Sequence, residues 1–167
     1  MRSVPLLSLL GLCSLLAVSV NAAPGASRTR VAMTEKSAAT FYVSTNIAGV
    51  GAAELMVDTG SGYVAINEVT LATLKRGGHA TYLRQLQGIL ADGTEMNVPV
   101  YRISGMSIGQ RCWLANIEVA VFPGNSRQIL GLSALRKAAP FVFSVDPPEL
   151  QLSQCAPPPV QAAAPAS

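Results

Sequence analysis

The chain has 167 residues, of which half are hydrophobic and 13% are charged, and its formal net charge is +3. This charge is small and the basic residues are scattered, so we expect no nucleic acid partner and no binding to an anionic membrane surface. The hydrophobic fraction is inflated by the apolar N-terminal segment at 1–22, and without Arg2 the net charge falls by one to +2.

Residues 1–22 have the pattern of a secretory signal peptide. Arg2 precedes an apolar stretch at 6–20, and Val20-Asn21-Ala22 offers small or compact residues for cleavage before Ala23. An uncleaved anchor is the alternative, but a spanning helix needs roughly 20 apolar residues. We therefore expect an exported protein, periplasmic or secreted, with no membrane attachment after signal cleavage.

The rest of the chain divides into three predicted segments. We expect a flexible lead at 23–34, one folded domain at 35–155 and a disordered Pro/Ala-rich tail at 156–167. The domain contains Cys112 and Cys155, and disulfides persist in an oxidising compartment. Two cysteines alone leave a disulfide and two unpaired thiols equally open.

The first half of the domain is predicted to form strands and one helix. A strand pair at 41–43 and 52–57 is followed by a strand at 63–66. Asn67 can cap a helix over 68–76, and Gly77 suits its end. The apolar face of this helix would carry Val69, Leu71 and Leu74.

The second half is predicted to form hairpins. Asp92-Gly93 is a strong turn signal within a hairpin at 87–101, and Pro99 predicts an edge or solvent-facing strand because it lacks a backbone donor. Further strands are expected at 103–108, 113–122, 129–132, 141–145 and 149–152, with one or two helical turns at 133–138. The pattern indicates an all-β fold, a small closed or partly open barrel with one or two short helices.

The most informative motif is Asp58-Thr59-Gly60-Ser61, which occurs once and follows the apolar run Leu55-Met56-Val57. A strand that ends in this motif can present a carboxylate on a tight turn, because glycine adopts backbone angles that other residues resist. Asp and Gly also occur in ordinary hairpin turns for local reasons, so Asp58 could be a simple turn residue.

Three features occur in a diagnostic order. The Asp58 motif is followed first by the Asp92-Gly93 hairpin and then, further along the chain, by Ile129-Leu130-Gly131. This arrangement resembles the retropepsin-like aspartic proteases, single-domain relatives of the pepsin family, over nearly all of 41–152. In size and layout it is most similar to the exported bacterial members. The resemblance implies a small closed barrel.

The resemblance also implies roles for residues. Asp58 would be the catalytic carboxylate, and a second chain would supply its counterpart, so that a homodimer is required for the active site. Thr59 would brace the two loops across the dimer axis, and Gly60 would let them approach. The loop would be supported by Ile129, Leu130 and Gly131. A flap over a peptide or protein substrate would be formed by Ala91, Asp92, Gly93 and Thr94. The hairpin at 141–152 would help form the dimer interface.

The implied chemistry needs no metal and no other cofactor. Two carboxylates about 3 Å apart share one proton, as is general in aspartic proteases. The ionised carboxylate acts as a general base on water, and the protonated one donates to the scissile carbonyl. Many half-size members carry Ala where this chain has Ser61. We expect its hydroxyl to donate to the outer carboxylate oxygen and to place the activity optimum at mildly acid pH.

The sequence departs from the family pattern at the flap tip, 91–94, which is not a run of glycines, and at 132–135, which lacks a bulky aromatic residue. The alternative function is a non-catalytic peptide-binding module on the same fold, which would hold a peptide by strand addition under the flap. A third is an exported structural or adaptor domain. His79, Arg84 and Arg102 are expected to be solvated side chains without a functional role.

Overall fold

The computed structural model of the chain describes residues 28–89 and 93–159. In chain order the elements are β1 (Thr29–Ala32), β2 (Thr34–Lys36), η1 (Ser37–Ala39), β3 (Thr40–Ile47), β4 (Gly51–Val57), β5 (Val64–Asn67), α1 (Glu68–Arg76), β6 (Ala80–Ile89), β7 (Glu95–Ile108), β8 (Cys112–Phe122), β9 (Ile129–Leu130), α2 (Leu132–Leu135), η2 (Arg136–Ala138), β10 (Phe141–Ser144) and β11 (Glu149–Leu152).

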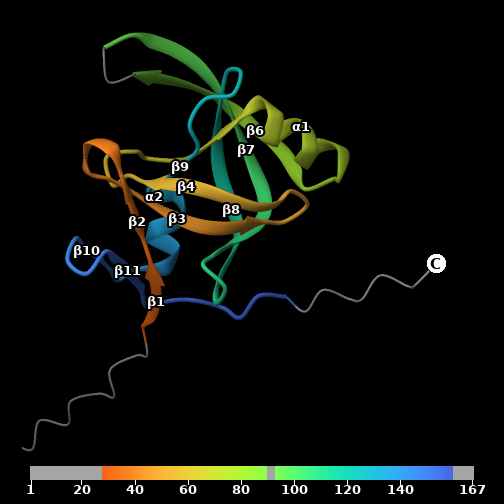
Figure 1. Cartoon of the computed structure of the whole chain (residues 1–167). Coiled ribbons are helices and arrows are strands. Elements are labelled where there is room, and N and C mark those ends of the chain that lie inside the picture. The colour runs from red at the N-terminus through yellow and green to blue at the C-terminus, as the bar shows by residue number, and fades with distance from the viewer. Residues whose placement is uncertain (1–27, 90–92, 160–167) are drawn as a thin grey trace, which may run out of the picture.

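Six strands close into a barrel (Figure 1). Neighbours follow the order β3-β4-β9-β5-β8-β7, and β7 pairs back onto β3 to complete the ring. The β4–β9 and β5–β8 pairs are parallel, and the other pairs of the ring are antiparallel. β2 and β6 lie outside the ring, beside β3 and β7. The predicted all-β fold, a small closed barrel with short helices, is confirmed.

The core consists of the inward-facing side chains of the ring, the buried face of α1, and buried side chains of β1, α2, η2 and β11. The alternation of buried and exposed residues along β3 is the period-2 pattern of a strand with one buried face. The largest fully buried side chains are Ile47, Leu55, Ile66, Leu74, Ile103, Met106, Ile108, Ile117, Leu130, Leu135, Leu150 and Leu152.

Helix α1 occupies the predicted range, and the Asn67 side chain accepts the amide of Thr70 as the predicted cap. Leu71 and Leu74 are buried as expected. The prediction for Val69 was wrong, because this side chain is 63% exposed while Thr70 is buried in its place.

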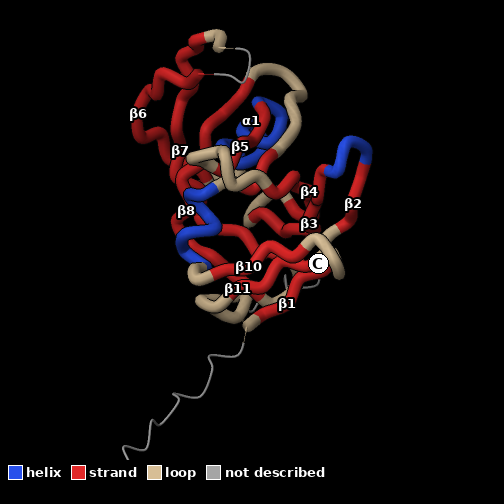
Figure 2. The backbone as a smooth tube through the Cα atoms, turned by 90° about the vertical axis from the view of Figure 1, so that its left-hand side faces the viewer, coloured by secondary structure: helices blue, strands red, loops and turns tan. Residues whose placement is uncertain are grey.

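A separate three-stranded antiparallel sheet has the order β1-β11-β10 (Figure 2). It lies at the opposite end of the molecule from the β6/β7 hairpin. The predicted flexible lead is therefore wrong for residues 29–34, which form β1 and begin β2. The physical reason is burial, because Val31 and Met33 are only 7% exposed and β1 pairs along its whole length with β11.

The chain beyond β11 is attached to β8. Cys112 and Cys155 form a disulfide, and the amide and carbonyl of Trp113 pair with Ala156 at 2.9 and 3.3 Å. The predicted disorder is wrong at Ala156, because its backbone groups are paired. Pro158 and Pro159 border a hollow together with Trp113. Residues 160–167 of the predicted tail lie outside the described residues.

Strand β7 lies between β6 and β8 from Val100 onward, but its part around Pro99 is an edge, as predicted from that residue. Pro99 pairs with Gln85 of β6, and pairing with β8 begins one residue later at Val100. Proline therefore occupies a position where β7 has one neighbour, which explains why its missing donor is tolerated. Over residues 28–89 and 93–159, no helix is long and apolar enough to cross a membrane.

Candidate active site

The Asp58 loop joins β4 to β5 and is organised by short backbone contacts. The amide of Gly60 donates to Asp58 Oδ1 at 2.8 Å, and the amide of Ser61 donates to the Asp58 carbonyl at 3.3 Å. These bonds hold one carboxylate oxygen against the turn. Asp58 is half-buried, whereas Thr59 and Gly60 are exposed, so the tip of the loop is open to a partner.

Strand β9 supports this loop from behind. Ile129 and Leu130 pair with Met56 and Val57 of β4, and the Leu130 carbonyl accepts the amide of Asp58 at 3.1 Å. On the other side of the loop, the amide of Leu132 donates to the Ser61 carbonyl at 2.8 Å. The start and the end of the loop are thus bonded to one short segment.

Gly131 lies between these two bonds at a point of very close approach. A β-carbon on this residue would lie 2.0 Å from the carbonyl oxygen of Tyr63 and 2.8 Å from that of Ser61. The segment can pass directly against the loop only because residue 131 has no side chain.

The Ser61 hydroxyl does not make the predicted bond to the Asp58 carboxylate. It donates instead to the Tyr63 carbonyl at 2.8 Å. A hydroxyl has a single proton to donate, so this bond leaves none for the carboxylate. In this structure the Ser61 hydroxyl stabilises the end of the loop. We therefore no longer expect Ser61 to set the pH optimum through a bond to the Asp58 carboxylate.

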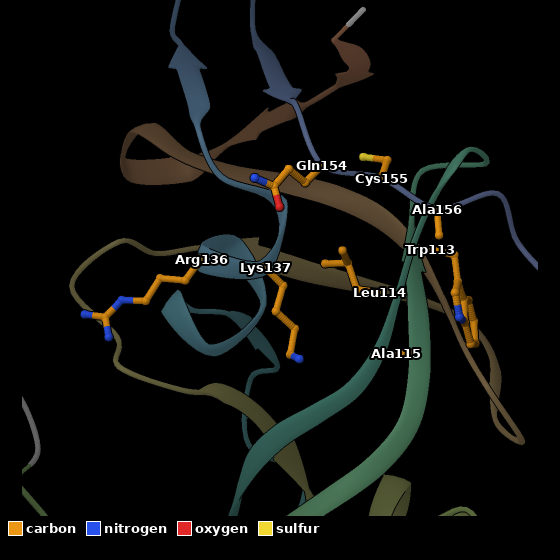
Figure 3. Close-up of a pocket in the computed structure, with 8 residues that line it drawn as sticks. All are labelled: Trp113, Leu114, Ala115, Arg136, Lys137, Gln154, Cys155 and Ala156. Carbon is orange, nitrogen blue, oxygen red and sulfur yellow. The ribbon is translucent and has the colours of Figure 1, made fainter. Parts of the chain in front are cut away.

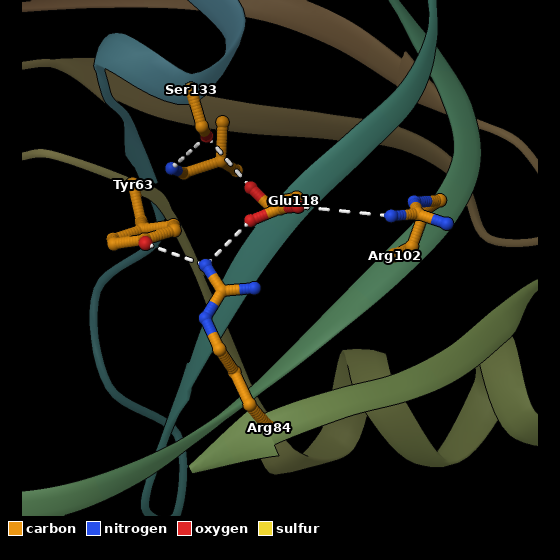
Figure 4. Close-up of polar contacts among 6 residues, drawn as sticks. Tyr63, Arg84, Arg102, Glu118 and Ser133 are labelled. Atoms are coloured by element: carbon orange, nitrogen blue, oxygen red, sulfur yellow. Dashed lines mark hydrogen bonds and ion pairs between the residues drawn. The ribbon is translucent and has the colours of Figure 1, made fainter. Parts of the chain in front are cut away.

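A polar network connects the loop to the outer strands (Figure 4). Arg84 Nη2 donates to the Tyr63 hydroxyl and to Glu118 Oε2, both at 2.8 Å, and Arg102 Nη2 lies 3.8 Å from Glu118 Oε1. Glu118, and secondarily the Tyr63 hydroxyl, raise the pKa of the Arg84 guanidinium above its usual value. The two arginines are therefore partnered, and not simply solvated as predicted.

Ser133 links α2 to the same region. Its hydroxyl donates to the Glu118 carbonyl at 2.7 Å and accepts the amide of Val64 at 2.8 Å. Val64 begins β5 immediately after the loop. At 132–135, where the sequence departs from the family pattern, the Ser133 hydroxyl therefore links α2 to both β5 and β8 by hydrogen bonds.

The N-terminus of α1 holds the segment that leads into β9. Asn67 Nδ2 donates to Asn125 Oδ1 at 3.1 Å and to the Ser126 carbonyl at 3.3 Å. The Thr70 hydroxyl donates to Gln128 Oε1 at 3.0 Å. Sequence reasoning found Asn67 as a helix cap but missed this second role, because the partners lie 58 and 59 residues further along the chain.

The predicted flap lies at the tip of the β6/β7 hairpin. Gly93 has a φ of +83°, as a tight turn requires, and Ile89 pairs with Glu95 across the hairpin. Thr94 is exposed, and Ala91 and Asp92 lie outside the described residues. The hairpin extends beyond the barrel at the end nearest α1 (Figure 1).

A surface hollow of about 630 Å³ lies elsewhere (Figure 3). Its walls come from the start of β8, from η2 and from the segment after β11, and they contain no residue of the Asp58 loop or of the β6/β7 hairpin. Arg136, Lys137 and Gln154 are its polar side chains. The hollow offers no carboxylate and is separate from the candidate active site.

His79 also lies away from the loop. Its Nδ1 is 3.2 Å from the Ser104 hydroxyl, and its ring covers Gly49 so closely that a β-carbon there would lie 2.0 Å from Cδ2. The ring is half-buried rather than freely exposed. Its role in the fold is to pack against the turn between β3 and β4.

A closed β-barrel with a single Asp-Thr-Gly loop, backed by a short strand that is followed directly by glycine, defines a single-domain aspartic protease fold. The family model described as gag-polyprotein putative aspartyl protease matches residues 43–137, which is more than half of the chain. The matched range contains the Asp58 loop, the β6/β7 hairpin and β9. The chain belongs to this family of retropepsin-like aspartic proteases.

Among solved structures, the chain is similar to the crystal structure of a retropepsin-like aspartic protease from Rickettsia conorii. The TM-score is 0.52 and the sequence identity is 19%, over 78% of this chain and 92% of that one. At this identity the likeness shows the fold. No curated protein matches the chain in sequence.

Proposed function

We propose that the protein is an exported aspartic endopeptidase of the bacterial type, whose active site is assembled from two copies of the chain. The observation that carries this proposal is the Asp58 loop, in which a half-buried carboxylate is held by the Gly60 amide on a turn whose tip is exposed. One chain supplies one such carboxylate, and the chemistry needs two.

In the proposed mechanism the two Asp58 carboxylates face each other across a water molecule and share one proton. The ionised carboxylate removes a proton from the water as the water attacks the peptide carbonyl carbon. The protonated carboxylate donates its proton to the carbonyl oxygen. The shared proton belongs to the pair and not to either copy. The β6/β7 hairpin would close over the bound peptide and exclude bulk water.

Two features support the homodimer. No hydrogen bond involves the Thr59 side chain within the described part of the chain, although Thr59 stands exposed beside Asp58. In the separate sheet, β10 pairs on one side only, with β11, and its outer edge is open among the described strands. Val142 on β10 is 38% exposed, and Val145, in the turn directly after β10, is 59% exposed. An open strand edge with exposed valines suits pairing with a second copy.

Export is supported by two independent features. The signal-like pattern of residues 1–22 is one, and the Cys112–Cys155 disulfide is the other. Disulfides are stable in the periplasm and outside the cell and are rare in a reducing cytosol. We propose a periplasmic or secreted location.

Cleavage of a peptide library by the chain without residues 1–22 tests the proposal, at about pH 4 to 7.5 and over a dilution series. Wild type should cleave extended peptides, Asp58→Asn should not, and activity per mole should fall on dilution. Asp58→Asn keeps the shape of the side chain and serves as the matched control. If a folded, dimeric wild type binds peptides without cleaving them, the protein is instead a peptide-binding module.

A further inference from the structure

Arg84 connects two parts of the candidate active site that are far apart in the sequence. It lies on β6, the first strand of the hairpin that would cover substrate, while Tyr63 lies five positions after Asp58. Figure 4 shows the Arg84 side chain reaching from β6 to the Tyr63 hydroxyl and to Glu118. Nη2 makes both contacts at 2.8 Å, and the guanidinium carbon is 5.8 Å from the centre of the Tyr63 ring.

The backbone connects these two parts only indirectly, through the pairings of β6 with β7, β7 with β8 and β8 with β5. Within the described sheet β6 pairs with β7 and with no other strand, and the Asp58 loop is bonded to β9 and Leu132. The hairpin and the loop therefore have no direct backbone hydrogen bond to each other, and two intervening strands separate them. The Arg84 side chain adds a direct bond between them.

Glu118 makes the connection selective for arginine. It lies on β8 directly opposite Arg102 on β7, and its carboxylate faces Arg84 from one side and Arg102 from the other. A guanidinium presents several donors in a fixed plane, so one group can satisfy a carboxylate and a phenol together. A lysine ammonium at position 84 is a compact charge without that fixed geometry.

We propose that Arg84 is a positioning residue that sets the β6/β7 hairpin relative to the Asp58 loop through the Tyr63 hydroxyl, with Glu118 holding the guanidinium in place. Its consequence for activity rests on the proposed protease function. The tie would order the peptide-binding cleft before substrate arrives, so its loss should weaken substrate binding more than it slows the chemical step.

A double-mutant cycle of Arg84→Gln and Tyr63→Phe tests the proposal by hydrogen–deuterium exchange on the chain without residues 1–22. Each single variant should raise exchange at 58–66 and 80–89 by about 3- to 5-fold, as expected for loss of one partly exposed pair. The double variant should show little further increase, because both changes remove one contact. Arg84→Lys should retain only part of the protection.

Arg102→Gln is the matched control, because it removes an arginine that approaches the same Glu118 carboxylate without touching Tyr63. Arg102→Gln should leave exchange at 58–66 within about 2-fold of wild type. When it is combined with Tyr63→Phe, the effects of the two substitutions on exchange should be additive. If Arg84→Gln also leaves exchange at 58–66 unchanged, or adds fully to Tyr63→Phe, Arg84 is not a positioning residue. Melting temperatures of all variants verify that they are folded.

Kinetics provide a second readout. Arg84→Gln and Tyr63→Phe should raise KM by about 3- to 5-fold and change kcat by less than about 2-fold. If kcat instead falls by about 3- to 5-fold while KM is unchanged, Arg84 does not act by ordering the cleft. If wild type does not cleave peptides but the exchange cycle shows the expected coupling, the proposed function fails while the structural tie stands.

Discussion

The Cα of Gly131 faces the carbonyl of Tyr63, and a β-carbon at position 131 would lie 2.0 Å from that oxygen. The contact involves backbone on both sides, so no rotation of a flexible side chain can relieve it. It places the segment after β9 directly behind the loop that carries Asp58. The geometry of the loop therefore depends on the absence of a single methyl group.

Gly131→Ala should destabilise the fold and displace the Asp58 loop. Overpacking of this kind costs about 3 kcal/mol in the free energy of unfolding. Urea denaturation measures this change, and peptide cleavage should fall with it. Gly62→Ala is the matched control in the same loop, because a β-carbon there meets nothing within 4 Å. It should change the free energy of unfolding by less than about 0.5 kcal/mol. Equal effects of the two substitutions would refute the steric account.

Ser61→Ala should leave the acid side of the pH–activity profile where it is in wild type. The Ser61 hydroxyl donates to the Tyr63 carbonyl rather than to Asp58. Its removal should therefore cost about 1 kcal/mol of stability through the lost loop contact. The two measurements are a pH series of kcat/KM and urea unfolding. An acid limb that moves to higher pH would show that the hydroxyl turns to the carboxylate in the active dimer.

Local sequence patterns predicted the parts of this fold that depend on local chemistry. The Asp58 turn, the capped helix α1 and the β6/β7 and β10/β11 hairpins each have a short-range signal, such as a capping side chain or a turn dipeptide. The support of the loop by 129–131 followed only from the family resemblance. Its parallel pairing with β4 joins Met56 to Ile129, which no local pattern connects.

The misses have a common physical cause. The sequence predicts a flexible lead where β1 lies, because a four-residue strand has little intrinsic signal. Its pairing with β11 joins the first described strand to the last. The Arg84–Glu118 pair joins β6 to β8 across β7. Charged side chains on a sheet surface find partners through strand order, which a pattern of single residues does not contain.

Asn67→Ala should destabilise the protein by about 2 kcal/mol, because it removes the cap of α1 and two bonds to the segment before β9. Asn67→Ser separates the two roles without adding a charge, since serine is also a good helix cap for the Thr70 amide but lacks the amide donor that reaches 125–126. It should recover about half of the loss. Thermal unfolding measures both variants. If the serine variant is as unstable as the alanine variant, the cap contributes nothing measurable.

Reduction of the Cys112–Cys155 disulfide should lower the free energy of unfolding by about 4 kcal/mol on the chain-entropy model, since the two residues are 43 positions apart. The amides of Ser153 and Gln154 still donate to the Ala138 carbonyl, at 3.0 and 3.2 Å, so the segment after β11 keeps part of its attachment. Urea unfolding with and without a thiol reductant gives the difference.

The Cys112→Ala/Cys155→Ala variant is the control for that measurement, because its unfolding should not respond to the reductant. Cys112 is fully buried beside the barrel core, and removing its sulfur leaves only a small cavity. The variant should therefore unfold close to the reduced wild type. A wild-type midpoint that does not move on complete reduction would mean that the backbone bonds of Ser153, Gln154 and Ala156 hold this segment without the disulfide.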